Sequence, residues 1–271
     1  MWLPLVSIIL PAYNCEKYIS EAVNSILQQV YDNFELIIIN DGSTDNTSSI
    51  LSSIADQRLR ILENDGNKGL IYSLNRAIDE SKGELIARMD ADDIATNDRI
   101  EKEVHWLLHH PETAAVGTFI KIIDENAKEK PKWKLDRETY TSEAIRKVMP
   151  KENCLAHPTM MIRSNILKQY RYAESQKNIE DYDLWLRMLA DGLVIEKIPQ
   201  PLLYYREHST SVTSKYLRSQ NPFLKNYHCK KKFLSQRRRE KKWGDFEAEV
   251  RKWMIRDRIM AFGKSVKQIF K

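Results

Sequence analysis

Glu84-Leu-Ile-Ala-Arg-Met-Asp-Ala-Asp-Asp93 joins a short apolar run to three closely spaced acids. The apolar residues predict a buried strand, and Gly83 precedes them as a break in regular structure. Because Asp90 and Asp92 lie two residues apart, an extended backbone directs both side chains to the same side. Carboxylates that meet at a strand end are typical ligands of Mg²⁺ or Mn²⁺, which keep waters and phosphates as further ligands.

The same acids allow other interpretations. Asp90 could open a calcium loop, but Ile94 stands where that loop needs an oxygen ligand and Ala95 where it needs glycine. Asp92 or Asp93 could instead cap the following helix, or the acids could form a solvated loop. This stretch alone therefore leaves helix capping and an exposed loop open beside metal and phosphate chemistry.

The composition is that of a soluble globular protein. The chain has 271 residues, of which 42% are apolar and 30% charged, enough for one large or two small domains. Cys15, Cys154 and Cys229 are widely spaced and form no disulfide or zinc pattern, so reduced thiols in a cytoplasmic protein are expected. Neither a signal peptide nor a membrane-spanning run is predicted.

The charge is distributed unevenly along the chain. Residues 215–271 carry 18 Lys and Arg against 5 Asp and Glu, whereas the whole chain has a net charge of only +5. The body is therefore acidic and the tail strongly basic, which predicts that the tail faces an anionic partner or a partner different from that of the body.

Strands and helices alternate through the first half. Strands are predicted at 6–10, 34–39, 59–62 and 85–89, with a helical pattern after each of the first three. The absence of a hairpin signal predicts an α/β fold, with a parallel sheet and helices on both faces. The sheet edge where ligands bind should display Tyr13, Asn14, Asp41, Asn67, Gly69, Asp90 and Asp92. Since the dinucleotide fingerprint and the P-loop motif are missing, this edge suits a mononucleotide.

The second half is less regular. A helix is expected from about 97 to 109, a strand at 114–123, a charged turn at 124–132 and a further strand at 159–163.

Six motifs together resemble the family-2 glycosyltransferases of the GT-A fold, the inverting group that builds bacterial surface polysaccharides. They are Val6-Ser-Ile-Ile-Leu-Pro-Ala-Tyr-Asn14, Ile39-Asn-Asp-Gly-Ser-Thr-Asp45, Asn67-Lys-Gly69, Ala87-Arg-Met-Asp-Ala-Asp-Asp93, Glu180-Asp-Tyr-Asp-Leu-Trp185 and Tyr205-Arg-Glu-His208. The resemblance covers about residues 5–212. It implies a Rossmann-like, mostly parallel sheet and transfer of a sugar from a nucleotide-sugar donor, with UDP favoured, to a glycan or polyprenyl-linked acceptor in polysaccharide synthesis.

The resemblance also implies a role for each matched position. The implied donor-binding residues are Pro11, Ala12, Tyr13, Asn14, Asp41, Asn67, Gly69, Arg88, Asp90, Ala91 and Asp92. The implied ligands of Mn²⁺ or Mg²⁺ are Asp90, Asp92 and His208, with Asp92 as the more direct of the two acids. Asp181 is implied as the general base, and Glu180, His157 and Trp185 lie on the acceptor side.

Structural roles compete with several of these assignments. Asp41 could serve the turn before Gly42, and Arg88 could simply pair with a neighbouring acid. The acids at the start of the Glu180 helix could cap it, and a lone histidine such as His208 is often only a hydrogen-bonding residue.

One motif departs from the family pattern. Many relatives have a Gly-Gly-Tyr turn that lines the acceptor pocket, whereas this chain has Lys168-Gln-Tyr-Arg-Tyr172. Without glycine, this loop is expected to adopt a conformation that ordinary residues allow.

Two other functional classes are considered. A sugar-nucleotide or nucleotidyl transferase would need a basic, glycine-rich phosphate loop after the first strand, and a non-catalytic sugar-binding module would have lost acids that are present here. The basic tail alone suggests nucleic acid, and no recognition motif supports that partner.

The expected domains are a GT-A unit at 1–214 and a basic helical extension at 215–271. The unit comprises a nucleotide half of about 1–110 and an acceptor half of about 111–214. Basic residues interleaved with Trp, Phe and Leu are typical of a helix on an anionic bilayer. This predicts a cytoplasmic enzyme with peripheral contact at the inner membrane. Alternatively, Ile255, Ile259 and Val266 could form a buried stripe that packs on the domain.

Overall fold

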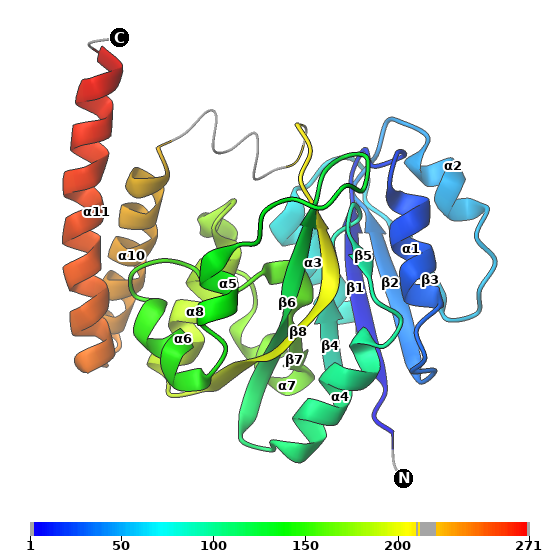
Figure 1. Cartoon of the computed structure of the whole chain (residues 1–271), viewed down its shortest axis with the longest axis horizontal. Helices are drawn as coiled ribbons and strands as arrows, with labels where there is room; N and C mark the ends of the chain where they lie inside the picture. Colours follow the sequence, from blue (N-terminus) through cyan, green and yellow to red (C-terminus); the bar gives the residue numbers. More distant parts are fainter. Residues whose placement is uncertain (1–2, 210, 212–220, 270–271) are drawn as a thin grey trace.

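An eight-stranded mixed sheet organises the chain, and the computed structural model describes residues 3–209, 211 and 221–269 (Figure 1). The strand order is β3-β2-β1-β4-β7-β6-β8-β5. The strands are β1 (Val6–Ala12), β2 (Phe34–Asn40), β3 (Leu59–Glu63), β4 (Leu85–Arg88), β5 (Ile94–Ala95), β6 (Thr113–Ile123), β7 (Met161–Arg163) and β8 (Val194–Arg206).

Helices cover both faces of this sheet and extend beyond one end of it (Figure 1). The helices are α1 (Ile19–Leu27), α2 (Thr47–Ser52), α3 (Leu70–Glu80), α4 (Arg99–His109), α5 (Lys134–Glu138), α6 (Ser142–Val148), α7 (Ser164–Tyr170), α8 (Glu180–Ala190), α10 (Pro222–Arg239) and α11 (Asp245–Ile269). Two short 3₁₀ helices are η1 (His157–Thr159) and η2 (Glu174–Gln176).

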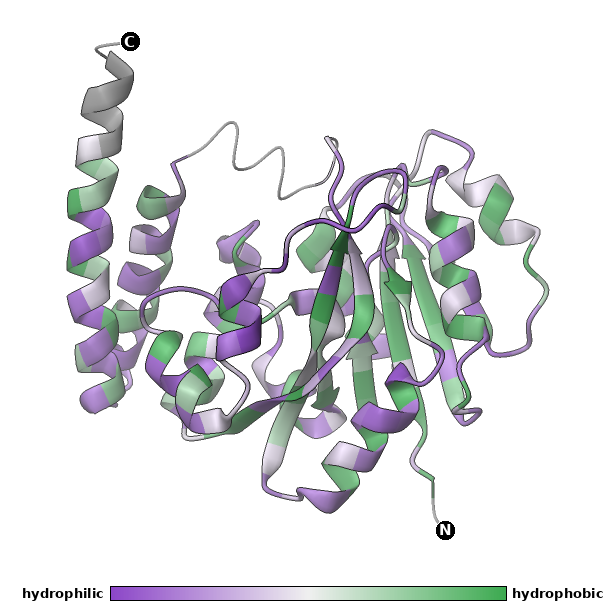
Figure 2. Cartoon of the chain, viewed as in Figure 1, coloured by the Kyte–Doolittle hydropathy of each residue, from purple (hydrophilic) through white to green (hydrophobic). Residues whose placement is uncertain are grey.

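Alternation along the buried strands divides the core between the two faces. Ile8 of β1 packs with α1 and α4 on one face, whereas Ile9 points to the opposite face and packs with α3. Neighbouring β2 alternates in the same way, which is expected for a parallel strand covered by helices on both sides. Figure 2 shows this as apolar strands flanked by helices striped with polar residues. The predicted α/β fold is confirmed.

The sheet is parallel in its first half and mixed in its second. Strands β3, β2, β1 and β4 run parallel, as do the paired β6 and β8. The short strands β7 and β5 pair antiparallel with their neighbours. The strand predicted at 159–163 is shorter, because the 3₁₀ turn η1, which contains Pro158, includes Thr159 and the strand begins only at Met161.

The basic tail folds as a helical hairpin against α8 (Figure 1). Phe233 of α10 and Val250 of α11 are buried in the same apolar cluster as α8. Between the two helices, the buried Lys230 Nζ donates to Asp257 Oδ2 at 2.6 Å and to the Lys151 carbonyl at 2.9 Å. Part of the tail therefore packs on the body, as the alternative interpretation required.

The rest of that alternative is wrong for α11. Ile255 is 49% exposed and Ile259 is 66% exposed, so neither belongs to a buried stripe. The Val266 side chain lies outside the described residues. Over the described parts of the chain, every helix is too short or too polar to cross a bilayer.

Candidate active site

Three carboxylates gather in the turn that follows β4. Asp90, Asp92 and Asp93 each offer an oxygen, and these oxygens lie within 4.8 Å of one another. Asp93 is 1% exposed and accepts a hydrogen bond from the Arg206 backbone N–H at 2.8 Å. Its other oxygen, Oδ2, is buried without a hydrogen-bond partner among the described residues. A divalent cation would satisfy that oxygen, so the donor set fits the predicted metal.

The end of β8 brings a histidine to these acids. His208 Nε2 lies 2.8 Å from Asp92 Oδ2, and its ring packs against Tyr18 with the ring centroids 5.0 Å apart. Arg206 holds the end of β8 beside the acids, because it donates to the Asp92 carbonyl at 2.9 Å and to Glu21 at 2.6 Å. The sequence-predicted ligands are therefore brought together.

The buried Arg88 side chain opposes the negative charge of this cluster. It donates through both terminal nitrogens to Asp90. Burial raises the pKa of Asp90 to about 6, an effect that Arg88 opposes and the charge of Asp92 reinforces. Burial also raises the pKa of Asp93. A bound cation would favour the ionised carboxylates in the same place.

Asp41 holds the predicted ribose–phosphate loop at the edge of the sheet. Its carboxylate accepts hydrogen bonds from the backbone N–H groups of Lys68 at 2.9 Å and Gly69 at 2.8 Å, and from Asn64 Nδ2 at 2.6 Å. Gly42, with φ of +66°, packs so closely that an added Cβ would lie 2.5 Å from the Gly66 backbone. The structural role of Asp41 thus differs from the expected alternative, because its carboxylate holds the 64–69 loop, whereas Asn40 Oδ1 accepts the Ser43 N–H in the turn at Gly42.

The loop after β1 packs against the loop after β2. Asn14, with φ of +48°, accepts a hydrogen bond from the Thr44 N–H at 2.8 Å and donates its own N–H to Ser43 Oγ at 3.0 Å. Tyr13 is 46% exposed at this edge, whereas Pro11 and Ala12 are buried in β1. An exposed aromatic ring beside a fixed backbone suits stacking on a base. Asn67 lies at the same edge, in the loop that the Asp41 carboxylate holds, and its backbone is close to Gly42.

The candidate base, Asp181, lies in the first turn of α8. Asp181 Oδ2 accepts a hydrogen bond from Asn153 Nδ2 at 2.7 Å. Burial raises the pKa of Asp181, while hydrogen bonds from the Tyr182 N–H and Asn153, together with the charge of Arg88, act in the opposite direction. Burial and the neighbouring Asp181 charge raise the pKa of Glu180 to about 7. The charge of Asp181 also contributes to the raised pKa of Asp90, so the base and metal cluster share one electrostatic environment.

The other acceptor-side residues form a buried aromatic group. His157 Nε2 lies 2.7 Å from the Tyr172 hydroxyl, and its ring meets Trp185 edge-on with the centroids 6.1 Å apart. Burial and the charge of Arg88 hold the pKa of His157 well below its usual value, which keeps the ring neutral. Trp185 is completely buried, so its side chain supports the predicted acceptor side from within the core.

The loop without glycine does not adopt an ordinary conformation. Arg171 has φ of +47° and ψ of 166°, which corrects the expectation drawn from the missing glycines. Arg187 holds the strained backbone by donating to the carbonyls of Tyr170 at 2.6 Å and Arg171 at 2.7 Å. Asp183 in turn accepts from Arg187 Nε at 2.8 Å. The surrounding structure thus imposes a glycine-like turn on an arginine.

Three supporting residues went unassigned in the sequence. Asn153 contacts the base, Asn64 contacts Asp41, and Tyr172 contacts His157. Tyr172 ends the loop that departs from the family pattern, but nothing in the local sequence around Tyr172, Asn153 or Asn64 indicates these long-range partners. Arg206 lay within a recognised motif, without a role of its own.

The fold and this acidic cluster define a GT-A glycosyltransferase. The model of the family described as "Glycosyl transferase family 2" matches residues 7–171. The chain belongs to this family, and it is a glycosyltransferase.

Named relatives include enzymes of surface polysaccharide synthesis. The chain is 33% identical over 232 residues to the O-antigen biosynthesis glycosyltransferase WbnJ of Escherichia coli, covering 84% of this chain and 86% of that one. It is 32% identical over 189 residues to the E. coli enzyme named UDP-Glc:alpha-D-GlcNAc-diphosphoundecaprenol beta-1,3-glucosyltransferase WfgD, covering 69% and 71%.

Two solved structures share the fold. S. aureus TarS 1-349 in complex with UDP-GlcNAc has a TM-score of 0.70 at 21% identity, and the match covers 85% of this chain but 65% of that one. The mannosyltransferase PcManGT from Pyrobaculum calidifontis, in complex with GDP-Man and Mn²⁺, has a TM-score of 0.67 at 18% identity and coverage of 98% and 76%.

Proposed function

We propose that the enzyme displaces UDP directly from a UDP-sugar and inverts the anomeric carbon. Asp90, Asp92 and His208 would hold Mn²⁺ or Mg²⁺, and Asp181 would be the base. The observation that carries this proposal is that the buried Arg88 pairs with Asp90 of the acidic cluster and that its charge also acts on Asp181. A displacement that removes a proton and releases a diphosphate needs a base and a group that stabilises the leaving charge, and Asp181 and the acidic cluster would supply these two functions.

Each residue would make a distinct contribution. Asp181 takes the proton of the acceptor hydroxyl as its oxygen attacks the anomeric carbon and the bond to the diphosphate oxygen breaks. Asn153 orients the Asp181 carboxylate through the 2.7 Å hydrogen bond. The bound metal ion supplies stabilisation of the charge on the leaving diphosphate. Tyr13 and the Asp41 loop bind the nucleoside.

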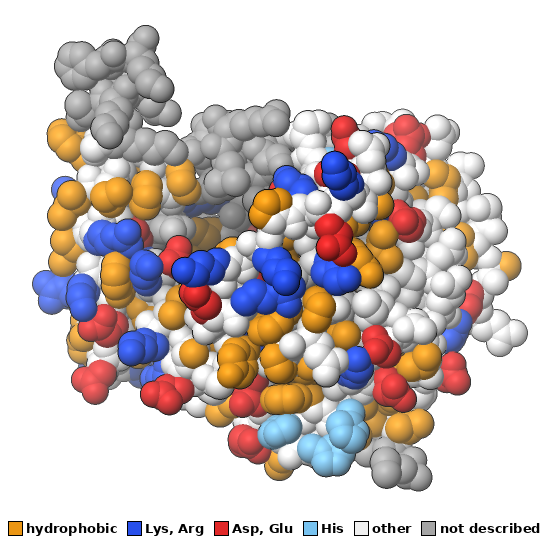
Figure 3. Space-filling model, viewed as in Figure 1, with side chains coloured by type: hydrophobic (Ala, Val, Ile, Leu, Met, Phe, Trp, Pro, Cys, Tyr) orange, Lys and Arg blue, Asp and Glu red, His pale blue; other side chains and the backbone are white. Residues whose placement is uncertain are grey.

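The proposed acceptor is a sugar hydroxyl of a glycan carried on a polyprenyl diphosphate. The name of the relative WfgD, which gives its acceptor as a diphosphoundecaprenol, supports this choice. The tail supports peripheral contact with the cytoplasmic face of an anionic inner membrane, because α11 exposes apolar and basic side chains together. Figure 3 shows Lys and Arg interspersed with hydrophobic residues over this end of the molecule.

A screen of UDP-Glc, UDP-GlcNAc and GDP-Man for hydrolysis or transfer, with Mn²⁺, Mg²⁺ or EDTA, tests the reaction. Asp92→Ala should abolish metal-dependent UDP binding in calorimetry and leave the fold intact. Asp181→Asn should keep UDP binding but lower turnover by about 10²–10⁴-fold.

The exposed Asp32 provides the control, since Asp32→Asn should change neither quantity. Undiminished UDP and Mn²⁺ affinity in Asp92→Ala would contradict the assignment of Asp92 as a metal ligand. Near-normal turnover in Asp181→Asn would show that Asp181 is not the general base.

A further inference from the structure

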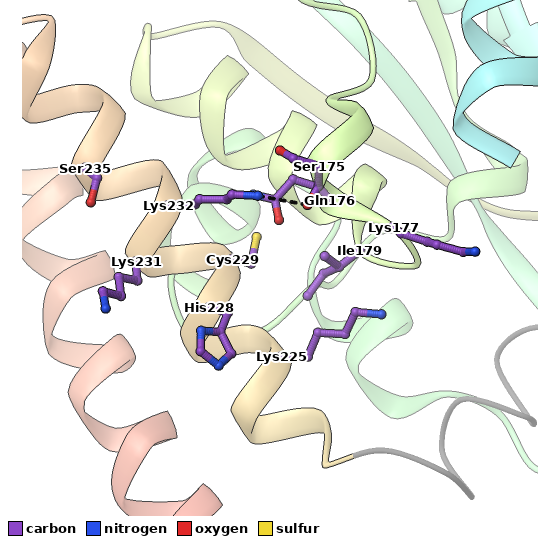
Figure 4. Close-up of a pocket in the computed structure, with 10 residues that line it drawn as sticks. All are labelled: Ser175, Gln176, Lys177, Ile179, Lys225, His228, Cys229, Lys231, Lys232 and Ser235. Atoms are coloured by element: carbon purple, nitrogen blue, oxygen red, sulfur yellow. Dashed lines mark hydrogen bonds between the residues drawn. The ribbon is translucent and has the colours of Figure 1, made fainter. Parts of the chain in front are cut away.

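A basic cavity lies between α10 and the loop that leads into α8 (Figure 4). Its volume is about 430 Å³, within the range of small-molecule sites. Its described lining residues are Ser175, Gln176, Lys177, Ile179, Lys225, His228, Cys229, Lys231, Lys232 and Ser235. Four of these ten residues are lysines and none is acidic, so we call the cavity the lysine pocket.

Local structure concentrates positive charge here. Lys225 and Lys232 are separated by two turns of α10, and both extend toward the 175–179 loop (Figure 4). Lys232 Nζ donates to the Ser175 carbonyl at 3.0 Å, which joins helix and loop. Burial lowers the pKa of Lys225, and the nearby charge of Lys177 lowers it further. A bound anion would stabilise the charged form of Lys225 and so oppose both effects.

The lysine pocket is adjacent to the proposed catalytic base. Its lining residue Ile179 is followed directly by Glu180 and Asp181. The charge of Glu180 also acts on Lys225, raising its pKa against the effect of burial. An anionic group held in the pocket would therefore lie on the acceptor side, while Asp90 and Asp92 stand at the edge where the donor diphosphate is expected.

We propose that the lysine pocket binds the diphosphate group of the acceptor and thereby directs the acceptor sugar toward Asp181. This inference rests on the proposed function, because it assigns the acceptor side of the same reaction. Ammonium groups with hydroxyl and amide donors suit a diphosphate, which offers many strong acceptor oxygens. The same chemistry could bind phospholipid headgroups or the diphosphate of UDP, and the test must separate these sources.

The test measures binding of farnesyl diphosphate by calorimetry in EDTA, so that no metal ion can hold the probe at the acidic cluster. Lys177→Gln/Lys225→Gln should weaken this binding by about tenfold for each lysine removed. The control Lys82→Gln/Lys147→Gln removes two exposed lysines that do not line the pocket and should bind like the wild type. Thermal melts monitored by circular dichroism should show that both variants fold.

Three further arms make the result specific. Farnesol lacks phosphate and should therefore bind all variants with the same affinity. UDP with Mn²⁺ should bind Lys177→Gln/Lys225→Gln as tightly as it binds the wild type. Equal farnesyl diphosphate affinity in the pocket and control variants would overturn the inference.

It would also be overturned if the pocket variant lost binding only to phosphatidylglycerol vesicles, because the headgroup would then be the ligand. Failure of the wild type to bind UDP and Mn²⁺ would instead reject the proposed function, while leaving the result with farnesyl diphosphate interpretable.

Discussion

At the residue scale, the candidate base depends on one amide. Asn153 donates to Asp181 Oδ2 and so favours the ionised carboxylate, whereas burial favours the protonated form. Loss of this donor should therefore raise the pKa of Asp181. A base with a higher pKa is protonated at higher pH, so activity should be lost earlier as the solution is acidified.

Asn153→Ala should accordingly move the acid limb of the kcat/KM profile upward by about one pH unit, the equivalent of one hydrogen bond. The measurement is kcat/KM against pH for the wild type and the variant under identical metal and donor concentrations. An unchanged acid limb with lower activity throughout would show that Asn153 acts only through packing.

Arg171 stores backbone strain in the acceptor-side loop. Its φ of +47° favours glycine, and its guanidinium pairs with Asp79 at 2.5 Å. Arg171→Gly and Arg171→Ala lose the same ion pair, so comparing them isolates the backbone. The Gly variant should be more stable than the Ala variant by about 1 kcal/mol.

Urea unfolding would measure both free energies. The exposed helical position Lys147 is the control, because Gly should there be less stable than Ala by about 1 kcal/mol. The same order of stability at both positions would contradict the assigned strain.

At the scale of an element, α11 has two different faces. Phe246 and Val250 are buried against the body, whereas Ile255, Ile259 and Phe262 lie on turns further along and are 49%, 66% and 74% exposed. Their spacing of four and three residues places them on one side of the helix. With flanking basic residues, this exposed side suits an anionic bilayer surface.

Ile259→Asp/Phe262→Asp should therefore abolish flotation of the protein with phosphatidylglycerol liposomes, because it places charge in the apolar face. The control Leu3→Asp/Val30→Asp changes two similarly exposed apolar residues on the body and should float normally. Equal flotation of the two variants, or none by the wild type, would show that α11 is not a membrane contact.

The elements that the sequence predicted share a local cause. A continuous apolar run such as residues 36–39 favours a buried parallel strand, and the acids after β4 favour a turn at the edge of the sheet. By contrast, the turn at Arg171 and the Asn153–Asp181 contact depend on residues 16 and 28 positions away. The periodicity of apolar residues carries no information about such contacts. The family motifs include only some of the residues that make them.

At the scale of the whole molecule, the predicted boundary near residue 214 divides motifs but not the core. Cys229 and Phe233 of α10 are 1% exposed and share an apolar cluster with Trp185. Burying a side chain such as Phe233 contributes about 1.5–3 kcal/mol. The catalytic unit should therefore require α10 and α11 for its stability.

A chain truncated to residues 1–214 should melt well below the full-length chain and bind a dye for exposed apolar surface. Scanning calorimetry and dye fluorescence would measure the two effects. If the truncated chain melted like the full-length protein, the helical hairpin would be an independent appendage, and the sequence-predicted division would also be a division of stability.

The contacts of Arg206 and His208 with Asp92 have a consequence for biosynthesis. The contacting residues are 114 and 116 positions apart in the chain. A ribosome adding 5–20 residues per second would need roughly ten seconds to make the intervening chain. The nucleotide half can emerge and collapse during that interval, but Asp92 cannot contact Arg206 and His208 until the end of β8 has been made. If the proposed metal site is correct, a nascent or prematurely terminated chain would lack part of it and should not consume nucleotide sugar before the acceptor half exists.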